Sequence, residues 1–400
     1  MRIAYISYEH PLGIAGGGIG TYIGQISRLM ASRGHEIEVF SGHIDENQTL
    51  NIDGYILHLI KSGNSSEFRE NVLAKFIDRH EAKLFEVIES PEYGADALLI
   101  KKKFPSLPLA VKLHTPSFLV SLLNNYNGTF LKKLRFIIGG LIRGKLVRPY
   151  WIYNKENDPE YQLFILANSV CSPSNSLKKI VNGTWGNRAI SVIPNLFIPS
   201  IELTPGIKKN DAPLTVTFIG KLERRKGILD LIKAIPMILK EEQEIQFMFV
   251  GAPLGSPIKG LKMDEYINLK LKKQLNHIKF KGFVPYQDMD KVFKETDICI
   301  LPSLWENFPT VCLEAMSAGI PVIGTSNGGM ADIIENDKTG VLIHQNSPTE
   351  ITQAIIKLKR DYKLREEIAV NGHKHILENY NGDTLGKIIE GFYDKTIAAH

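Results

Sequence analysis

The chain has 400 residues, with 48 lysines and arginines against 43 acidic residues, and a formal net charge of +5 at pH 7. A hydrophobic content of 44% and a charged content of 23% are typical of globular proteins and exclude a disordered or fibrous chain. The length favours two domains of roughly 150–200 residues each. The stretch MRIAYISYEHPLG lacks the apolar core of a signal peptide, and no apolar run is long enough to span a membrane. We therefore expect a cytoplasmic protein.

The three cysteines, Cys171, Cys299 and Cys312, are odd in number and form no C-x-x-C pair. This pattern predicts reduced, buried thiols rather than disulfides or metal ligands.

In the first half, apolar runs alternate with helical patterns. Residues 2–7 predict a strand, 21–34 a helix that ends at Gly34, and 36–41 the next strand. Similar patterns follow at 85–91, at 107–116 and, as a strand, turn and helix, from 167. The succession predicts a parallel sheet with helices on both faces.

Residues 130–151 contain six basic residues and no acidic residue. The segment is interpreted either as a solvated pair of basic helices over a core or as a surface that contacts anionic lipid at the inner face of the membrane.

The second half begins after a proline-rich stretch at 190–213, which we interpret as a linker. A helix is expected from 227 to 240. Strands are expected at 214–220, 245–251, 278–284, 298–303, 321–326 and 340–344. The chain is therefore predicted to be an α/β protein of two Rossmann-like domains facing across a cleft, 1–197 and 198–382. The final amphipathic helix, within 383–400, either caps the second domain or packs back on the first.

Ligands of open α/β sheets bind at the carboxyl ends of the strands, so the loops there are the candidate sites. The first such loop, 9–22, carries Gly16, Gly17, Gly18 and Gly20 before a helix. Such a loop suits an anion at a helix N-terminus, although ordinary turn glycines would look the same. The spacing is not the G-x-G-x-x-G fingerprint, which disfavours a nicotinamide dehydrogenase.

A second loop, 218–227, follows a strand and holds four cations: Lys221, Arg224, Arg225 and Lys226. Cations next to a helix N-terminus oppose the helix dipole, and a bound diphosphate would offset this conflict. The alternative is a solvated basic turn.

The third loop contains ENFPTVCLE, with Glu306 in the loop and Glu314 in the second turn of the following helix. Two carboxylates suggest either a general acid and base or two ligands for hydroxyl groups. The neighbouring cationic loop favours the second interpretation, in which both glutamates hold hydroxyls of one sugar nucleotide.

These loops, in this order, resemble the retaining GT-B glycosyltransferases of family 4, the glycosyl transferases group 1. ENFPTVCLE matches their E-x7-E signature, and the likeness continues through 314–343. VIPN (192–195), GKLERRKG (220–227) and the glycines at 16–18 lie where that family has further motifs. The resemblance covers most of both halves and is strongest over 214–345.

The resemblance implies roles for individual residues. Glu314 would hold the ribose and Glu306 the donor sugar, while Lys226 would bind the diphosphate. Lys221 stands where the family has an arginine, so Arg224 or Arg225 is expected to compensate. The implied donor-binding set is Gly17, Gly18, Asn195, Lys221, Arg225, Lys226, Glu306, Asn307, Phe308, Thr310, Val311 and Glu314.

His114, in KLHTP, matches the family histidine near the reacting carbon. With Lys226 and Glu306 it completes the implied catalytic set. Glu9, His10 and Glu92 are weaker candidates for acceptor contacts.

The implied reaction moves a sugar from a nucleotide diphosphate sugar to an acceptor hydroxyl with retention, in the synthesis of cell-surface polysaccharide, lipopolysaccharide or glycolipid. It requires no metal and no other cofactor, and no nucleic acid is an expected partner. Two alternatives stay open: a sugar-nucleotide epimerase of the same architecture, and an inactive subunit that binds a sugar nucleotide or a glycan.

Overall fold

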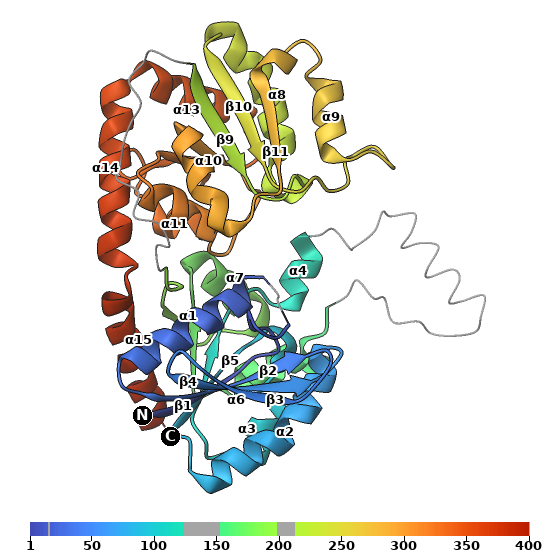
Figure 1. The fold of residues 1–400 in the computed structure, drawn as a ribbon, viewed down its shortest axis with the longest axis vertical. Helices are drawn as coiled ribbons and strands as arrows, with labels where there is room; N and C mark the ends of the chain where they lie inside the picture. Colours follow the sequence, from blue (N-terminus) through green and yellow to red (C-terminus); the bar gives the residue numbers. More distant parts are fainter. Residues whose placement is uncertain (15–16, 124–152, 198–212, 400) are drawn as a thin grey trace, which may run out of the picture. The chain divides into compact units, whose positions relative to one another are not determined.

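The computed structural model describes residues 1–14, 17–123, 153–197 and 213–399. The basic segment 130–151 and most of the predicted linker therefore lie outside the described residues. The chain forms two compact units (Figure 1). The first contains residues 1–173, 177–196 and 385–400, and the second contains 174–176 and 197–384.

The first unit is built on an eight-stranded sheet in the order β3-β4-β2-β1-β5-β6-β7-β8. Its strands are β1 (Arg2–Ile6), β2 (Glu36–His43), β3 (Gln48–Ile52), β4 (Tyr55–Lys61), β5 (Val87–Pro91), β6 (Leu109–Lys112), β7 (Ser169–Ser172) and β8 (Ser191–Val192). All neighbouring strands are parallel except β3 and β4. The central strands are buried on both faces, which explains why they read as continuous apolar runs.

The sheet is parallel, as predicted, except at its edge strand β3. This strand and β4 form a hairpin whose turn, Asp53–Gly54, has positive φ at both residues. A two-residue turn of this kind matches the twist of the flanking strands and brings them together antiparallel.

Helices cover the sheet of the first unit (Figure 1). They are α1 (Gly18–Ser32), α2 (Ser65–Ala82), α3 (Leu98–Lys103), α4 (Ser117–Leu123), α6 (Pro159–Leu166), α7 (Asn175–Trp185) and most of α15 (Gly382–Ala398). The chain leaves α1 through Gly34, at a φ of 89°. In α15, Leu385, Ile389 and Phe392 share a buried cluster with Tyr5 and Ile26 of the first unit.

The second unit is built on a six-stranded parallel sheet in the order β11-β10-β9-β12-β13-β14. All six predicted strands are present, as β9 (Leu214–Ile219), β10 (Ile245–Val250), β11 (Ile278–Gly282), β12 (Ile298–Leu301), β13 (Val322–Thr325) and β14 (Val341–Ile343). Its helices are α8 (Ile228–Glu241), α9 (Met263–Lys270), α10 (Met289–Glu295), α11 (Thr310–Ser317), α12 (Met330–Ile333), α13 (Pro348–Arg360) and α14 (Tyr362–Asn379). Short 3₁₀ turns lie at Tyr93–Ala95, Lys155–Asn157, Arg224–Lys226, Leu275–His277 and Tyr286–Asp288.

Two apolar clusters lie on opposite faces of the second sheet. Phe247 of β10 packs in one cluster, with α8 and α13, whereas the next residue, Met248, packs in the other, with α10 and α11. This alternation follows from the two-residue period of a strand. The second unit is therefore a sheet with helices on both faces, as predicted.

The three cysteines are free and buried, as expected. Among the helices that the structure describes, none has both the length and the apolar character to cross a membrane.

Candidate functional site

Three loops of the second unit follow the adjacent strands β9, β12 and β13, so they emerge at the same edge of the sheet. Backbone hydrogen bonds join them. The N–H of Leu304 donates to the carbonyl of Arg225 over 2.9 Å, and the N–H of Gly329 donates to the carbonyl of Glu306 over 2.8 Å. The predicted cationic loop and the glutamate loop are therefore held side by side.

Two glycines permit this close packing. Gly227 has a φ of 71°, and a Cβ atom there would overlap the carbonyl oxygen of Pro302. A Cβ atom on Gly329 would overlap the carbonyl oxygen of Asn307. Larger residues at either position would push the loops apart.

The carboxylate of Glu306 lies in the cationic loop. It accepts hydrogen bonds from the ammonium of Lys226 and from the hydroxyl of Ser303, the latter over 3.1 Å. The guanidinium of Arg225 lies 3.7 Å away and also pairs with Glu223 over 3.0 Å. Two cations thus share one carboxylate, and all three side chains are partly buried.

The remaining two cations of this loop, Lys221 and Arg224, are exposed. Arg224–Lys226 forms a 3₁₀ turn, and Gly227 separates this turn from α8. The cations therefore precede the helix rather than occupying its first turn.

Glu314 lies in the second turn of α11 and is surrounded differently. Burial raises the pKa of its carboxyl to about 7. Among the described residues, no side chain or backbone N–H forms a hydrogen bond or ion pair with this carboxylate. It is a half-buried acceptor whose hydrogen-bonding capacity is not used within the described part of the chain.

The backbone that was predicted to line the donor lies at the start of α11. Thr310 and Val311 are its first two residues, so their N–H groups have no acceptor within the helix. The side-chain oxygen of Asn307 accepts from Ser174 over 2.9 Å, and the ring of Phe308 is 9% exposed and packs near Tyr380.

In the first unit, His114 follows β6 and is buried. Its backbone N–H donates to both carboxylate oxygens of Glu92, over 2.9 and 2.7 Å. Its ring meets the ring of Tyr22 edge to face, with centroids 5.3 Å apart. Burial and the nearby Lys112 lower the pKa of His114 to about 3, so the imidazole is neutral at physiological pH.

Glu92 is also buried, and burial together with the nearby Glu160 raises its pKa to about 8. Glu160 accepts from the N–H groups of Ser117 and Gly94, over 2.8 and 3.0 Å. These two carboxyls hold the backbone of the loops after β5 and β6. Glu92 therefore contacts the chain around His114 rather than solvent.

The glycine loop of the first unit leads into α1, with Gly17 immediately before the helix. The carboxylate of Glu9 accepts from the N–H of Gly17 over 3.0 Å. A Cβ atom on Gly17 or Gly18 would meet open space, so the backbone is accessible there. His10 is buried instead. Its ring lies 3.1 Å from the hydroxyl of Tyr55, and burial lowers its pKa to about 4.

Asn195 follows β8 and is partly buried. Its side-chain oxygen makes no hydrogen bond to any part of the chain that the structure describes. The structure thus brings Lys226, Arg225 and Glu306 together in the second unit, and groups His114 with Glu92 in the first.

Comparison with known families covers both halves. A model of the glycosyl transferases group 1 matches residues 201–375, and a model of glycosyltransferase family 4 matches residues 16–198. The matches support a glycosyltransferase with the GT-B fold.

Individual relatives agree with this. An uncharacterised glycosyltransferase of Methanocaldococcus jannaschii is 24% identical over 97% of this chain and 96% of its own. The UDP-Gal:alpha-D-GlcNAc-diphosphoundecaprenol alpha-1,3-galactosyltransferase of Escherichia coli is 29% identical, over 48% of this chain and 50% of that enzyme. The match to the second relative therefore spans about half of its length.

Among solved structures, Anabaena HepE in complex with UDP aligns with a TM-score of 0.70 at 17% identity, over 98% of this chain and 100% of its own. At that identity the likeness shows the fold alone, and it confirms the predicted GT-B fold class.

Several neighbours of the predicted site residues were missed by the sequence analysis. Ser303 donates to Glu306, and the amide of Asn327 donates to the carbonyl of Leu304 over 2.7 Å. In the first unit, Lys112 is a buried lysine close to His114, and Glu89 is a buried glutamate that accepts from Tyr22. A charged residue within an otherwise apolar strand was the signal that could have identified the last two.

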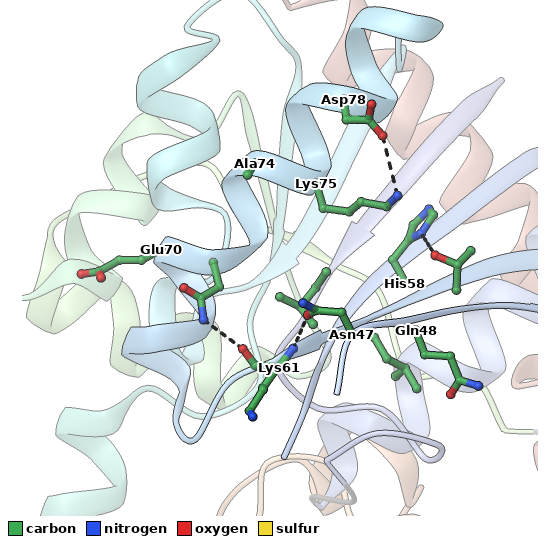
Figure 2. Close-up of a pocket in the computed structure, with 12 residues that line it drawn as sticks. Asn47, Gln48, His58, Lys61, Glu70, Ala74, Lys75 and Asp78 are labelled. Carbon is green, nitrogen blue, oxygen red and sulfur yellow. Dashed lines mark hydrogen bonds and ion pairs between the residues drawn. The ribbon is translucent and has the colours of Figure 1, made fainter. Parts of the chain in front are cut away.

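A hollow of about 650 Å³ lies elsewhere in the first unit, between the β3–β4 hairpin and α2 (Figure 2). In it, Thr49 bonds to His58 over 3.0 Å, and Asn71 donates to the carbonyl of Lys61 over 2.9 Å. Its lining residues are Asn47, Gln48, Thr49, His58, Leu59, Ile60, Lys61, Glu70, Asn71, Ala74, Lys75 and Asp78. None of them is a predicted site residue, so this hollow is separate from the candidate site.

Proposed function

We propose that the chain transfers a sugar from a nucleotide diphosphate sugar to an acceptor hydroxyl, with retention of configuration at the anomeric carbon. The observation that carries this proposal is that two carboxylates in different surroundings follow the same strand of the second sheet, β12. Glu306 is held by Lys226 and Arg225, whereas Glu314 has no polar partner among the described residues. A donor contains both a diphosphate for the cations and hydroxyls for the carboxylates.

Charge balance supports this arrangement. A diphosphate bound beside Lys226 competes with Glu306 for the ammonium, and the carboxylate released from that pair becomes an acceptor for sugar hydroxyls. Glu314, which lies in a different local environment, is left to accept from the ribose. Each glutamate then binds a different part of one ligand.

Under this proposal, Lys226 and Arg225 stabilise the negative charge that develops on the leaving diphosphate. The acceptor hydroxyl attacks from the same face, and the leaving diphosphate takes its proton. His114, neutral at physiological pH, contributes a hydrogen bond to the reacting sugar rather than a charge. No metal ion is assigned a role in this scheme.

The decisive experiment is a thermal-shift screen of the full chain against a panel of nucleotide sugars, followed by product analysis with the donor that stabilises it most. We expect a donor-dependent shift and a product whose anomeric configuration, determined by NMR, is that of the donor. Conversion of the donor's sugar without any acceptor indicates an epimerase instead. Binding without turnover over a panel of acceptors indicates an inactive subunit.

We further propose that the acceptor is lipid-linked and serves cell-surface glycan synthesis. Two observations support this: the six bases and interleaved apolar residues of segment 130–151, and a relative whose name specifies a diphosphoundecaprenol-linked acceptor. Flotation with anionic liposomes tests it. Recovery of the protein only in the soluble fraction, with anionic and neutral liposomes alike, contradicts the proposal.

A further inference from the structure

A fully buried carboxylate, Glu89 of β5, connects the C-terminal helix to the sheet of the first unit. One oxygen accepts from the hydroxyl of Tyr22 on α1 over 2.8 Å, and the other accepts from the hydroxyl of Tyr393 on α15, also over 2.8 Å. Tyr5 of β1 lies 3.1 Å from the Tyr393 hydroxyl. Glu89 is 1% exposed, so these hydroxyls replace the water that the carboxylate would otherwise bind.

A buried lysine completes this group of residues. Lys112 of β6 is 1% exposed and donates to the carbonyl of Ile193 over 2.6 Å. Its ammonium lies 5.2 Å from the centre of the Tyr22 ring. Burial raises the pKa of Glu89, and Lys112 offsets only part of this shift. The Tyr22 ring thus lies near the Lys112 ammonium, and its hydroxyl is held by Glu89.

This network lies next to His114. Lys112 precedes His114 by two residues on the same chain segment, and Glu89 lies on the neighbouring strand, paired with Ala110. The ring of Tyr22 contacts the ring of His114 edge to face, at an interplanar angle of 64°. Because the two rings are in contact, a shift of the Tyr22 ring also displaces the imidazole.

We propose that Tyr393 is a positioning residue for His114, acting through Glu89 and Tyr22. The proposal rests on the proposed function, which gives His114 its role in the reaction, and it assigns a new role to the helix α15. Without the Tyr393 hydroxyl, Glu89 keeps one donor fewer for a buried charge. The carboxylate then turns toward its remaining donor, and the Tyr22 ring moves with it.

The test compares Tyr393→Phe with Thr396→Val in the full chain. Both variants remove one buried hydroxyl from α15, but the hydroxyl of Thr396 donates only to the carbonyl of Phe392 in its own helix. The first readout is the NMR resonance of the His114 ring, assigned with a His114→Gln variant, because the edge contact with Tyr22 displaces it. We expect Tyr393→Phe to shift this resonance and Thr396→Val to leave it unchanged.

The second readout is UDP release from UDP-glucose. For Tyr393→Phe we expect kcat to fall about tenfold with KM changed by less than about twofold, because only the placement of the reacting groups is altered. An unshifted His114 resonance, or equal shifts in the two variants, overturns the positioning role. A wild-type chain that turns over no nucleotide sugar contradicts the proposed function alone, since the resonance test does not depend on turnover.

Discussion

At the scale of single residues, the two glutamates of ENFPTVCLE show how surroundings separate two identical side chains. Glu306 shares a site with two cations. Glu314 has only the burial effect, and its pKa is raised to about 7. Burial raises the pKa of the neighbouring Cys299 thiol well above its usual range, so this thiol stays protonated around neutral pH. This difference makes Glu314 the residue whose role can be tested by pH.

We predict that binding of the nucleotide sugar identified by the thermal-shift screen weakens as the pH falls below about 7. The pKa of Glu314 is raised, so the carboxyl gains a proton in this range and loses a charged acceptor for the ribose hydroxyls. Glu314→Gln should weaken binding by roughly tenfold at pH 8 and flatten the pH dependence. Isothermal titration calorimetry between about pH 5.5 and 8.5 measures both effects, since the diphosphate of a nucleotide diphosphate sugar does not titrate there.

Glu335→Gln is the matched control, because Glu335 is exposed and pairs with Lys338 outside the site. It should retain the wild-type profile. If Glu314→Gln also keeps that profile, the titrating group is not Glu314.

A second prediction concerns the ammonium of Lys226. Lys226→Ala should lower kcat by roughly a hundredfold or more, because a fixed cation at a developing negative charge contributes on this scale. Lys233→Ala is the control, since Lys233 is exposed and pairs only with Asp230 in α8. UDP release measured for both variants provides the comparison. Equal rates for Lys226→Ala and the wild type would remove Lys226 from the catalytic set.

At the scale of elements, the candidate site depends on loops that pack backbone against backbone. Gly227 occupies a left-handed conformation and faces the carbonyl of Pro302, so it serves both the turn and the close approach. The Leu304–Arg225 hydrogen bond forms at the same junction. The spacing between the cationic loop and the glutamate loop is therefore set by one glycine.

We predict that Gly227→Ala weakens binding of the nucleotide sugar identified by the screen by at least about tenfold, because the added methyl separates the two loops and strains the turn by roughly 1 kcal/mol or more. Gly183→Ala offers a control: a Cβ atom there meets nothing within 4 Å in α7, and alanine favours a helix. Thermal shift with and without that nucleotide sugar distinguishes the two variants. A Gly227→Ala variant with the wild-type ligand shift would show that this packing does not position the donor site.

The sequence was sufficient for most of the second unit. Buried parallel strands read as apolar runs, and all six were predicted, although their ends were set one or two residues too wide. The hairpin of β3 and β4 was overlooked because β3 is largely exposed and lacks an apolar pattern. Its turn carried a usable signal, Asp53–Gly54, which is a typical two-residue hairpin turn.

The candidate site was predictable only in part, because its loops follow from the strand pattern but its long-range contacts do not. Its loops could be found because ligands bind where parallel strands end. Contacts between distant parts of the chain could not be predicted. One example is the hydrogen bond between Glu89 and Tyr393, which joins residues 304 positions apart. Whether Glu92 and His10 face solvent also depends on such contacts, and both proved to be buried.

At the scale of the whole molecule, the first unit contains a helix, α15, that is far from its other elements in the sequence. Besides the buried tyrosine, α15 carries Glu390, which pairs with Arg33 over 2.8 Å and with His35 over 2.9 Å. Arg33 and His35 lower the pKa of Glu390 to about 2. The contribution of this pair is therefore present above the usual carboxyl pKa and is lost only as the pH falls toward 2. Apolar contacts and ion pairs act together to hold the helix on this unit.

We predict that a chain ending at residue 384 cannot keep its first unit folded. The deletion exposes the apolar partners of four buried side chains, Leu385, Ile389, Phe392 and Tyr393. Their burial contributes roughly 6–12 kcal/mol, at about 1.5–3 kcal/mol each, which is comparable to the stability of an entire domain. Removing only residues 398–400 should have little effect, because Ala398 and Ala399 are exposed. Hydrogen exchange of both truncated chains, followed at the strands of each unit, measures the difference: protection should be lost across β1, β2 and β5 in the longer deletion and retained in the shorter one. Full protection of these strands in the longer deletion would mean that the first sheet is stable without its terminal helix.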